Sequence, residues 1–204
     1  MMKAVKNVVV LTIITVLAGF LLGYVYDLTK APIEEATLKA KEEAYRNVFP
    51  KADSFEPVDG FDSNIATNGI NMAGFEGVTI DEALTSLDAS GNVLGYVFTV
   101  TSKEGYGGDI QLSMGISDDG TINGIEFLSI QETAGLGMKA DSDEFKSQFK
   151  GMNVKQISYT KTGKVNDYEI DAISGATITT NAVTNAVNAG LSYFESVNGG
   201  ADNE

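Results

Sequence analysis

The chain of 204 residues contains no cysteine and no histidine. Without cysteine there is no disulfide, no thiolate nucleophile, no lipid-modified cysteine, and no cysteine-bound zinc or iron–sulfur cluster. Without histidine, the usual catalytic triads and the commonest metal ligand are excluded. We therefore expect no catalytic acid–base residue and no metal site, and any redox chemistry must be supplied by a bound cofactor.

Basic residues are scarce as well. The chain has 14 Lys and Arg against 28 Asp and Glu, which gives a formal net charge of −14. A nucleic-acid-binding protein needs Lys and Arg at phosphates, so this charge argues against that class. The content of 43% hydrophobic and 21% charged residues is typical of a globular protein, here with an acidic surface.

A run of 19 residues without charge extends from Val8 to Tyr26. As a helix it would be about 28 Å long, close to the thickness of a bilayer's hydrocarbon core. A cleaved signal peptide is the alternative, because Lys3 and Lys6 precede the run, but the run exceeds the usual signal core and lacks a good cleavage site. We expect a retained transmembrane helix at 8–26, preceded by a cytoplasmic tail at 1–7.

The orientation of this segment does not follow from charge counting alone. Two lysines precede it, and four basic residues follow it within or near the flanking range that affects orientation: Lys30, Lys39, Lys41 and Arg46. The short basic tail and the large acidic remainder favour a domain outside the cytoplasm.

The rest of the chain predicts an α+β domain built on antiparallel β-hairpins. A linking helix is expected from Pro32 to Phe49, with Pro32 in its first turn and Pro50 ending it. Residues 51–77 are rich in Gly, Asn and Asp and are expected to form a loop with at most one short element. Strands are expected at 82–88, 93–101, 109–117, 121–130 and 154–160, with helices at 145–149 and 179–197.

These expectations divide the chain into successive parts. After the membrane helix come the linking helix and loop at 27–77, a folded domain at 78–197 and a flexible C-terminal tail at 198–204.

Three stretches stand out as candidates for binding: 105–109 (GYGGD), 132–139 (ETAGLGMK) and 171–180 (DAISGATITT). In the first two, glycines allow a close approach of backbone, Tyr106 offers a flat face, and Lys139 is able to meet a negative group. On sequence pattern alone, both stretches are more typical of connecting loops.

The third stretch precedes a helix. A helix that begins near Thr179 would direct its free N–H groups and its positive dipole end at residues 174–178, which is a suitable place for a phosphate. The alternative is an ordinary helix cap, with Thr177 or Thr179 as the N-cap residue.

The third stretch resembles the D-x-x-[ST]-G-A-T-x-T flavinylation motif of the FMN-binding domain family. In that family a flavin transferase joins FMN, through its phosphate, to the threonine that follows Gly-Ala. The resemblance implies covalent FMN on Thr177, attached by a phosphoester bond, and a transferase that recognises Asp171. The remaining motif positions are Ser174, Gly175, Ala176 and Thr179.

The other two stretches resemble the family's G-Y-x-G-x-I strand and its E-T-P-G-L-G-x-K loop, in the expected order, with alanine in place of proline at position 134. The resemblance implies that further residues bind the flavin, namely Tyr106, Glu132, Thr133, Gly135, Leu136, Gly137 and Lys139. It also identifies residues 78–197 as the FMN-binding domain.

Within that family, the length and the single N-terminal span are most like the G subunits of Rnf ion-translocating electron-transport complexes. The resemblance implies a component of a translocase in the cell membrane, in which FMN relays electrons among other subunits on the extracytoplasmic side. Three alternatives remain: a C-type subunit of a sodium-pumping NADH:quinone reductase, a free-standing extracytoplasmic flavin carrier, and an anchored domain that binds an anion without redox chemistry.

Overall fold

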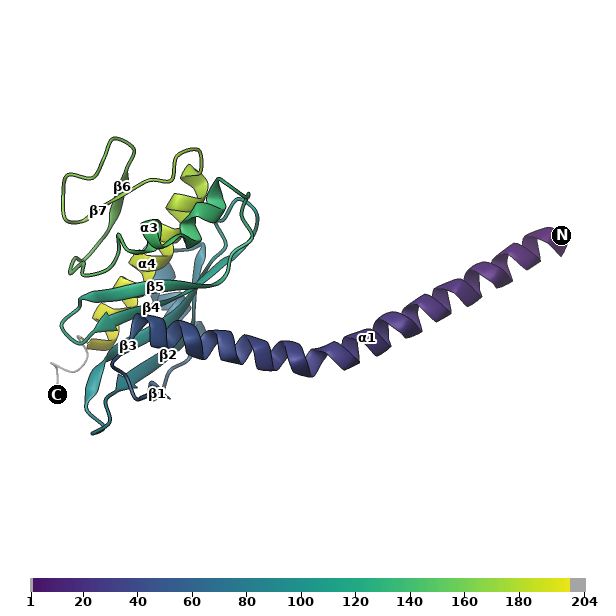
Figure 1. The fold of residues 1–204 in the computed structure, drawn as a ribbon, viewed down its shortest axis with the longest axis horizontal. Coiled ribbons are helices and arrows are strands. Elements are labelled where there is room, and N and C mark those ends of the chain that lie inside the picture. The colour runs from purple at the N-terminus through teal and green to yellow at the C-terminus, as the bar shows by residue number, and fades with distance from the viewer. Residues whose placement is uncertain (1, 199–204) are drawn as a thin grey trace. The chain divides into compact units, whose positions relative to one another are not determined.

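The computed structural model describes residues 2–198 of the chain, and Figure 1 shows their helices and strands. The chain divides between Glu42 and Glu43 into two compact units. Within residues 2–198, the first unit is helical and the second contains all the strands.

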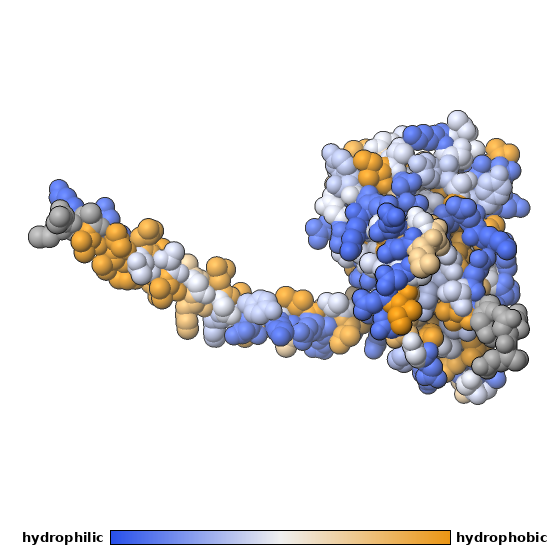
Figure 2. Space-filling model, turned by 180° about the vertical axis from the view of Figure 1, so that it is seen from behind, coloured by the Kyte–Doolittle hydropathy of each residue, from blue (hydrophilic) through white to orange (hydrophobic). Residues whose placement is uncertain are grey.

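Helix α1 spans Met2–Val48 and contains the expected transmembrane segment. It is long and apolar enough to cross a membrane, and its most apolar part buries no residue within the protein. Figure 2 shows this as apolar surface along the N-terminal part of the helix. So much exposed apolar surface needs a bilayer or a partner to cover it.

The expectation of a separate linking helix beginning at Pro32 was wrong, because α1 continues through Pro32 to Val48. Pro32 has no N–H to bond the carbonyl four residues earlier, which costs a helix about 3 kcal/mol. No glycine lies between Gly23 and Gly60, and helix formers such as Glu, Lys and Ala surround Pro32, so the helix persists. It ends just before Pro50, as predicted.

The second unit is built on an antiparallel sheet in the order β1-β2-β3-β4-β5. Its strands are β1 Ser54–Pro57, β2 Val78–Leu87, β3 Val93–Ser102, β4 Ile110–Ser117 and β5 Ile122–Ser129. Both predicted hairpins, β2–β3 and β4–β5, are confirmed. In the first, the Asp88 carboxylate closes the turn by accepting from the N–H groups of Ser90 and Asn92, at 2.8 and 2.9 Å.

Residues 51–77 hold two elements where at most one was expected, β1 and helix α2 (Ser63–Met72). Asp62 caps α2 by accepting from the N–H groups of Asn64 and Ile65. Ala66 and Ile70, four residues apart, are buried in the core. The compact unit therefore begins at Glu43, well before residue 78.

The C-terminal half adds short elements and one long helix: the 3₁₀ helix η1 (Gly137–Asp141), α3 (Asp143–Lys146), the parallel strands β6 (Ser158–Thr160) and β7 (Glu169–Asp171), and α4 (Thr177–Asn198). Helix α4 begins two residues earlier than expected and includes Asn198, while the rest of the expected tail, 199–204, lies outside the described residues.

The sheet carries apolar side chains on both faces. The larger core lies between the sheet and α4 and contains Phe98, Leu112 and Met114. Gly190 allows the helix to lie close to the sheet, since a Cβ there would be 2.0 Å from Met114 Sδ. The smaller core contains Tyr45, Val48 and Phe49 from the end of α1 and the following turn, with Leu84 and Val97 from the sheet.

Candidate functional site

The three stretches singled out in the sequence meet at one cavity of about 550 Å³. The residues that line it are Tyr106 from the first stretch, Glu132, Thr133, Leu136 and Gly137 from the second, and Gly175 to Thr179 from the third. The site is therefore formed by tertiary folding from segments that are far apart in the sequence.

Glu132 connects all three stretches through its carboxylate. Oε1 accepts hydrogen bonds from the backbone N–H groups of Tyr106 (2.8 Å) and Gly107 (3.2 Å). Oε2 accepts from the hydroxyl of Thr179, at 3.1 Å. Bonds to an ionised acceptor are stronger than neutral ones, so this single side chain fixes the relative positions of two loops and the first turn of α4.

Glycines are required where these segments approach each other. A Cβ on Gly107 would lie 1.9 Å from the carbonyl oxygen of Gln131, and one on Gly137 would lie 2.6 Å from Glu132 Oε2. The loops thus approach too closely at these positions to accommodate any side chain.

The segment that leads into α4 is held by its own hydrogen bonds. Gly175 has φ of 77°, in the left-handed region that favours glycine. The hydroxyl of Thr180 accepts from the N–H of Ile173 at 3.1 Å and donates to the carbonyl of Ala176 at 2.9 Å. Sequence reasoning gave Thr180 no role, although a threonine four residues after Ala176 is well placed to bond back to that carbonyl.

Thr177 is the first residue of α4, and its side chain is partly exposed at the cavity. The hydroxyls of Thr179, Thr180 and Thr184 donate to Glu132, Ala176 and Thr180 respectively. Within residues 2–198, by contrast, the Thr177 hydroxyl has no hydrogen-bond partner. Neither Thr177 nor Thr179 acts as the side-chain N-cap considered above, so the first N–H groups of α4 remain available for an anion.

Some of the residues expected to bind the flavin lie elsewhere. Lys139 and Ser174 line a separate cavity of about 340 Å³, together with Gln148 and with Asp171, the residue expected to be recognised by the transferase. Gly135 lies in the exposed loop that precedes η1, with φ of 76°. The structure thus divides most of the expected set between two cavities: Ser174 lines the smaller one, and Gly175 and the residues after it line the larger one.

Asp171 has a definite set of partners in this arrangement. Its Oδ1 accepts from the backbone N–H of Lys164 at 2.7 Å, which fixes the loop between β6 and β7. Its own backbone N–H donates to Gln148 Oε1 at 2.7 Å, and Gln148 Nε2 donates to its carbonyl at 3.3 Å. Gln148 therefore positions the start of the third stretch, a role for which the sequence offers no signal.

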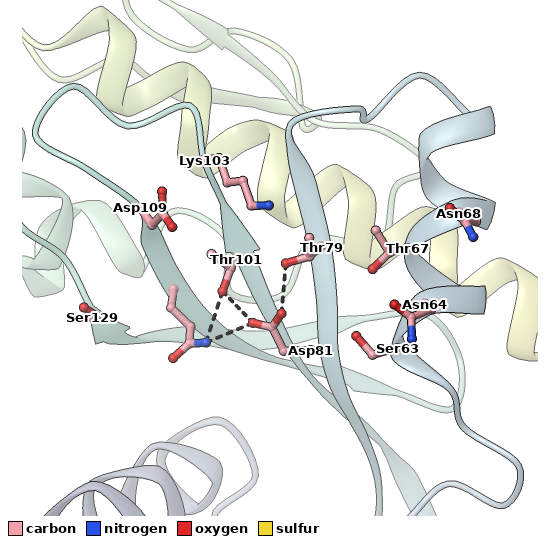
Figure 3. A pocket seen from close by; sticks show the side chains of 11 residues that line it. Ser63, Asn64, Thr67, Asn68, Thr79, Asp81, Thr101, Lys103, Asp109 and Ser129 are labelled. Atoms are coloured by element: carbon pink, nitrogen blue, oxygen red, sulfur yellow. Dashed lines mark hydrogen bonds between the residues drawn. The ribbon is translucent and has the colours of Figure 1, made fainter. Parts of the chain in front are cut away.

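A larger cavity, of about 610 Å³, lies between α2 and the ends of the strands (Figure 3). Its centre is Asp81, whose carboxylate accepts from the hydroxyls of Thr79 and Thr101 at 2.9 and 2.5 Å and from Gln111 Nε2 at 2.9 Å. These bonds link three adjacent strands. None of the residues expected to bind FMN lines this cavity, so size alone does not identify the site.

Comparison with known proteins identifies the domain and its relatives. Residues 105–192 match the FMN-binding domain family. The chain is 35% identical to the G subunit of the ion-translocating oxidoreductase complex of Methanosarcina acetivorans, over 95% of this chain and 96% of that protein. It is 34% identical to the G subunit of the Na(+)-translocating ferredoxin:NAD(+) oxidoreductase complex of Acetobacterium woodii, over 92% and 90%.

The fold is also found in a solved structure. The crystal structure of Shewanella oneidensis NqrC superposes with a TM-score of 0.52 at 19% identity, covering 78% of this chain and 88% of that one. The fold of the second unit, the meeting of the three stretches at Thr177 and the identity along nearly the whole chain lead to one conclusion: the chain belongs to the family of G subunits of ion-translocating oxidoreductase complexes, with an FMN-binding domain.

Proposed function

We propose that this protein is the membrane-anchored flavoprotein of an Rnf-type ion-translocating oxidoreductase complex, with FMN joined to Thr177 by a phosphoester bond. The observation that carries the proposal is the Thr177 hydroxyl, which is unpaired within the described chain and lies at the open start of α4 in a cavity of about 550 Å³. The names of the relatives, which are components of ion-translocating oxidoreductase complexes, support the assembly.

The residues around Thr177 fit the chemical parts of FMN. The unpaired N–H groups at the start of α4 suit its phosphate, because they and the helix dipole favour negative charge. Three exposed apolar side chains, Tyr106, Leu136 and Ile178, line the same cavity and suit a flat aromatic ring system. When bound, FMN supplies the electron-transfer chemistry that a chain without cysteine and histidine lacks.

The protein's own residues would bind and orient the FMN. Glu132 holds the loops that carry Tyr106 and Leu136 at a fixed distance from α4. Gly175 and Ala176 leave space beside Thr177, and Thr180 fixes the segment that contains them. A covalent bond to Thr177 would keep the cofactor attached outside the cytoplasm, where no internal pool replaces a lost one.

The proposal includes a location and a maturation step. Helix α1 anchors the chain in the cell membrane, and residues 43–198 lie on the extracytoplasmic side together with the partners of the complex. A flavin transferase attaches FMN and recognises the segment that begins at Asp171, whose main chain and carboxylate are held in place by Gln148 and Lys164.

The test is mass spectrometry of the full chain produced with and without a flavin transferase. We expect a mass increase of FMN less one water, located at Thr177, and a fluorescent band on a denaturing gel. Thr177→Ala should abolish both signals, whereas the control Thr162→Ala, at an exposed site in the β6–β7 loop, should retain them. An increment that survives Thr177→Ala would refute the proposed attachment.

A further inference from the structure

Within the acidic folded unit, net positive charge is concentrated in one stretch. Residues 145–166 contain five lysines and no Asp or Glu, whereas residues 52–138 contain one lysine, Lys103, and fourteen Asp and Glu. Both stretches belong to the compact unit 43–204. A strongly acidic folded unit thus carries one segment of opposite charge.

Most of these lysines are not engaged by the protein itself. Lys146 is largely buried and pairs with Glu126 at 2.8 Å and Asp141 at 3.4 Å. The other four are exposed and form no ion pair within the part of the chain that the structure describes: Lys150, Lys155, Lys161 and Lys164. We name these four the lysine surface. Since like charges repel, negative charge supplied from outside would lower the free energy of this surface.

The lysine surface is neither flat nor purely polar. Lys150 and Lys164 line the same cavity of about 430 Å³, where Asp167 is the only carboxylate. Val165, at the same cavity, is 87% exposed, and Tyr168 is also exposed. An exposed aliphatic and an aromatic side chain beside charged groups are typical of protein interfaces, in which an apolar centre is surrounded by a polar rim.

The lysine surface is also linked by a hydrogen bond to Asp171, the first residue of the stretch 171–180. The backbone N–H of Lys164 donates to Asp171 Oδ1 at 2.7 Å, and β7, which ends at Asp171, pairs with β6 between Lys155 and Lys161. A partner bound to these lysines would therefore lie against the loop whose position Asp171 fixes.

We propose that the lysine surface binds an acidic face of a partner protein of the complex, which docks against the loop between β6 and β7. The proposal rests on the proposed function, because that function places the partners of the complex on the same side of the membrane as residues 43–198. A protein is favoured over an anionic bilayer, since a uniformly negative membrane would also repel the acidic remainder of the unit. An acidic patch on a protein meets the lysines alone.

Carbodiimide cross-linking of membranes that hold the whole complex tests this directly, because the reagent joins a lysine amine to a carboxylate that contacts it. We expect cross-links from the lysine surface to Asp or Glu of another chain, mapped by mass spectrometry. The double variant Lys150→Glu and Lys164→Glu should lower the yield through the remaining Lys155 and Lys161 about tenfold, because each attraction becomes a repulsion. High salt should have the same effect on the unmodified chain.

The matched control is the double variant Lys51→Glu and Lys103→Glu, which changes the net charge equally at exposed lysines elsewhere. It should leave the yield unchanged. An equal loss in both variants, or cross-links that join only residues of this chain, would overturn the proposal.

Two further measurements separate the remaining outcomes. FMN loading, read by gel fluorescence, should be unchanged in both variants; loading lost only in the lysine variant would assign the surface to the transferase and overturn the proposal. Amine acetylation of the chain in phosphatidylcholine vesicles should modify Lys150 and Lys164 to the same extent whether or not the vesicles contain phosphatidylglycerol. Protection by the anionic lipid alone would make the partner a bilayer. An unmodified Thr177 in the parent chain would instead refute the proposed function, whatever the cross-links show.

Discussion

The two faces of the five-stranded sheet hold different parts of the protein. On one face, α4 covers a large apolar core and carries Thr177 at its first residue. On the other face, Tyr45, Val48 and Phe49, at the end of α1 and directly after it, pack against the sheet in a small core. The polar cluster around Asp81 lies farther along the strands on that face. The sheet therefore separates the proposed cofactor site from the attachment of the anchor helix, and damage to one face should leave the other's role intact.

The largest difference should come from the same substitution on each face. Leu112 is fully buried beneath α4, whereas Leu84 is 7% exposed in the smaller core. We expect Leu112→Ala to lower the free energy of unfolding by about 4 kcal/mol and Leu84→Ala by about 2 kcal/mol, because the larger core leaves a more complete cavity. Urea denaturation of the full chain in detergent measures both. Equal losses would contradict the comparison.

A second pair of variants distinguishes site assembly from stability. Glu132 joins three segments at the Thr177 cavity, and Glu82 accepts from the Tyr45 hydroxyl on the opposite face. Glu132→Ala and Glu82→Ala should each cost about 1–2 kcal/mol of stability through lost hydrogen bonds to a charged group. Only Glu132→Ala should reduce covalent FMN loading, measured by gel fluorescence. Reduced loading in Glu82→Ala would show that the two faces are coupled.

The smallest effect is a dependence of stability on pH. Burial, and then the hydrogen bond to Glu82, raise the pKa of Tyr45 above its ordinary value of about 10. The folded state then keeps the proton that the unfolded state loses. The stabilisation is therefore complete below about pH 10 and is lost as the pH rises towards the folded pKa.

Tyr45→Phe should make the free energy of unfolding less dependent on pH above about pH 10. A smaller dependence should remain, because burial also raises the pKa of Tyr193, which packs against the core on the α4 face. Denaturation curves at successive alkaline pH values measure the two contributions. An unchanged dependence in Tyr45→Phe would exclude Tyr45 as its source.

Strands β2 to β5 were predictable because they alternate or run apolar between clear turns, such as the Asp88–Asn92 turn. Helix α2 was missed because its sequence is rich in Asn, Thr and Gly, and only Ala66 and Ile70 reach the core. Pro32 led to the opposite error, a helix boundary that does not exist. Proline is common at the start of a helix, but the helix formers on both sides of Pro32 keep α1 continuous.

The site divides in the same way. Its three stretches could be found from glycines, a helix start and a family resemblance, and the structure brings them together. The role of Gln148 depends on contacts with backbone groups 23 residues away, and no local pattern encodes such a contact. Thr180 differs, because its bond to the carbonyl of Ala176 spans four residues and a local pattern could have indicated it. The separation of Lys139 and Ser174 from the Thr177 cavity likewise depends on how the 173–175 segment folds.

The bonds made by Glu132 have a consequence for the order of events in the cell. They join residues that are 26 and 47 positions apart in the sequence. Contacts of such long range form late in folding, because a large part of the chain must be ordered first. Thr177 acquires its cavity only when that ordering is complete, so loading of the cofactor should report that an individual chain has finished folding.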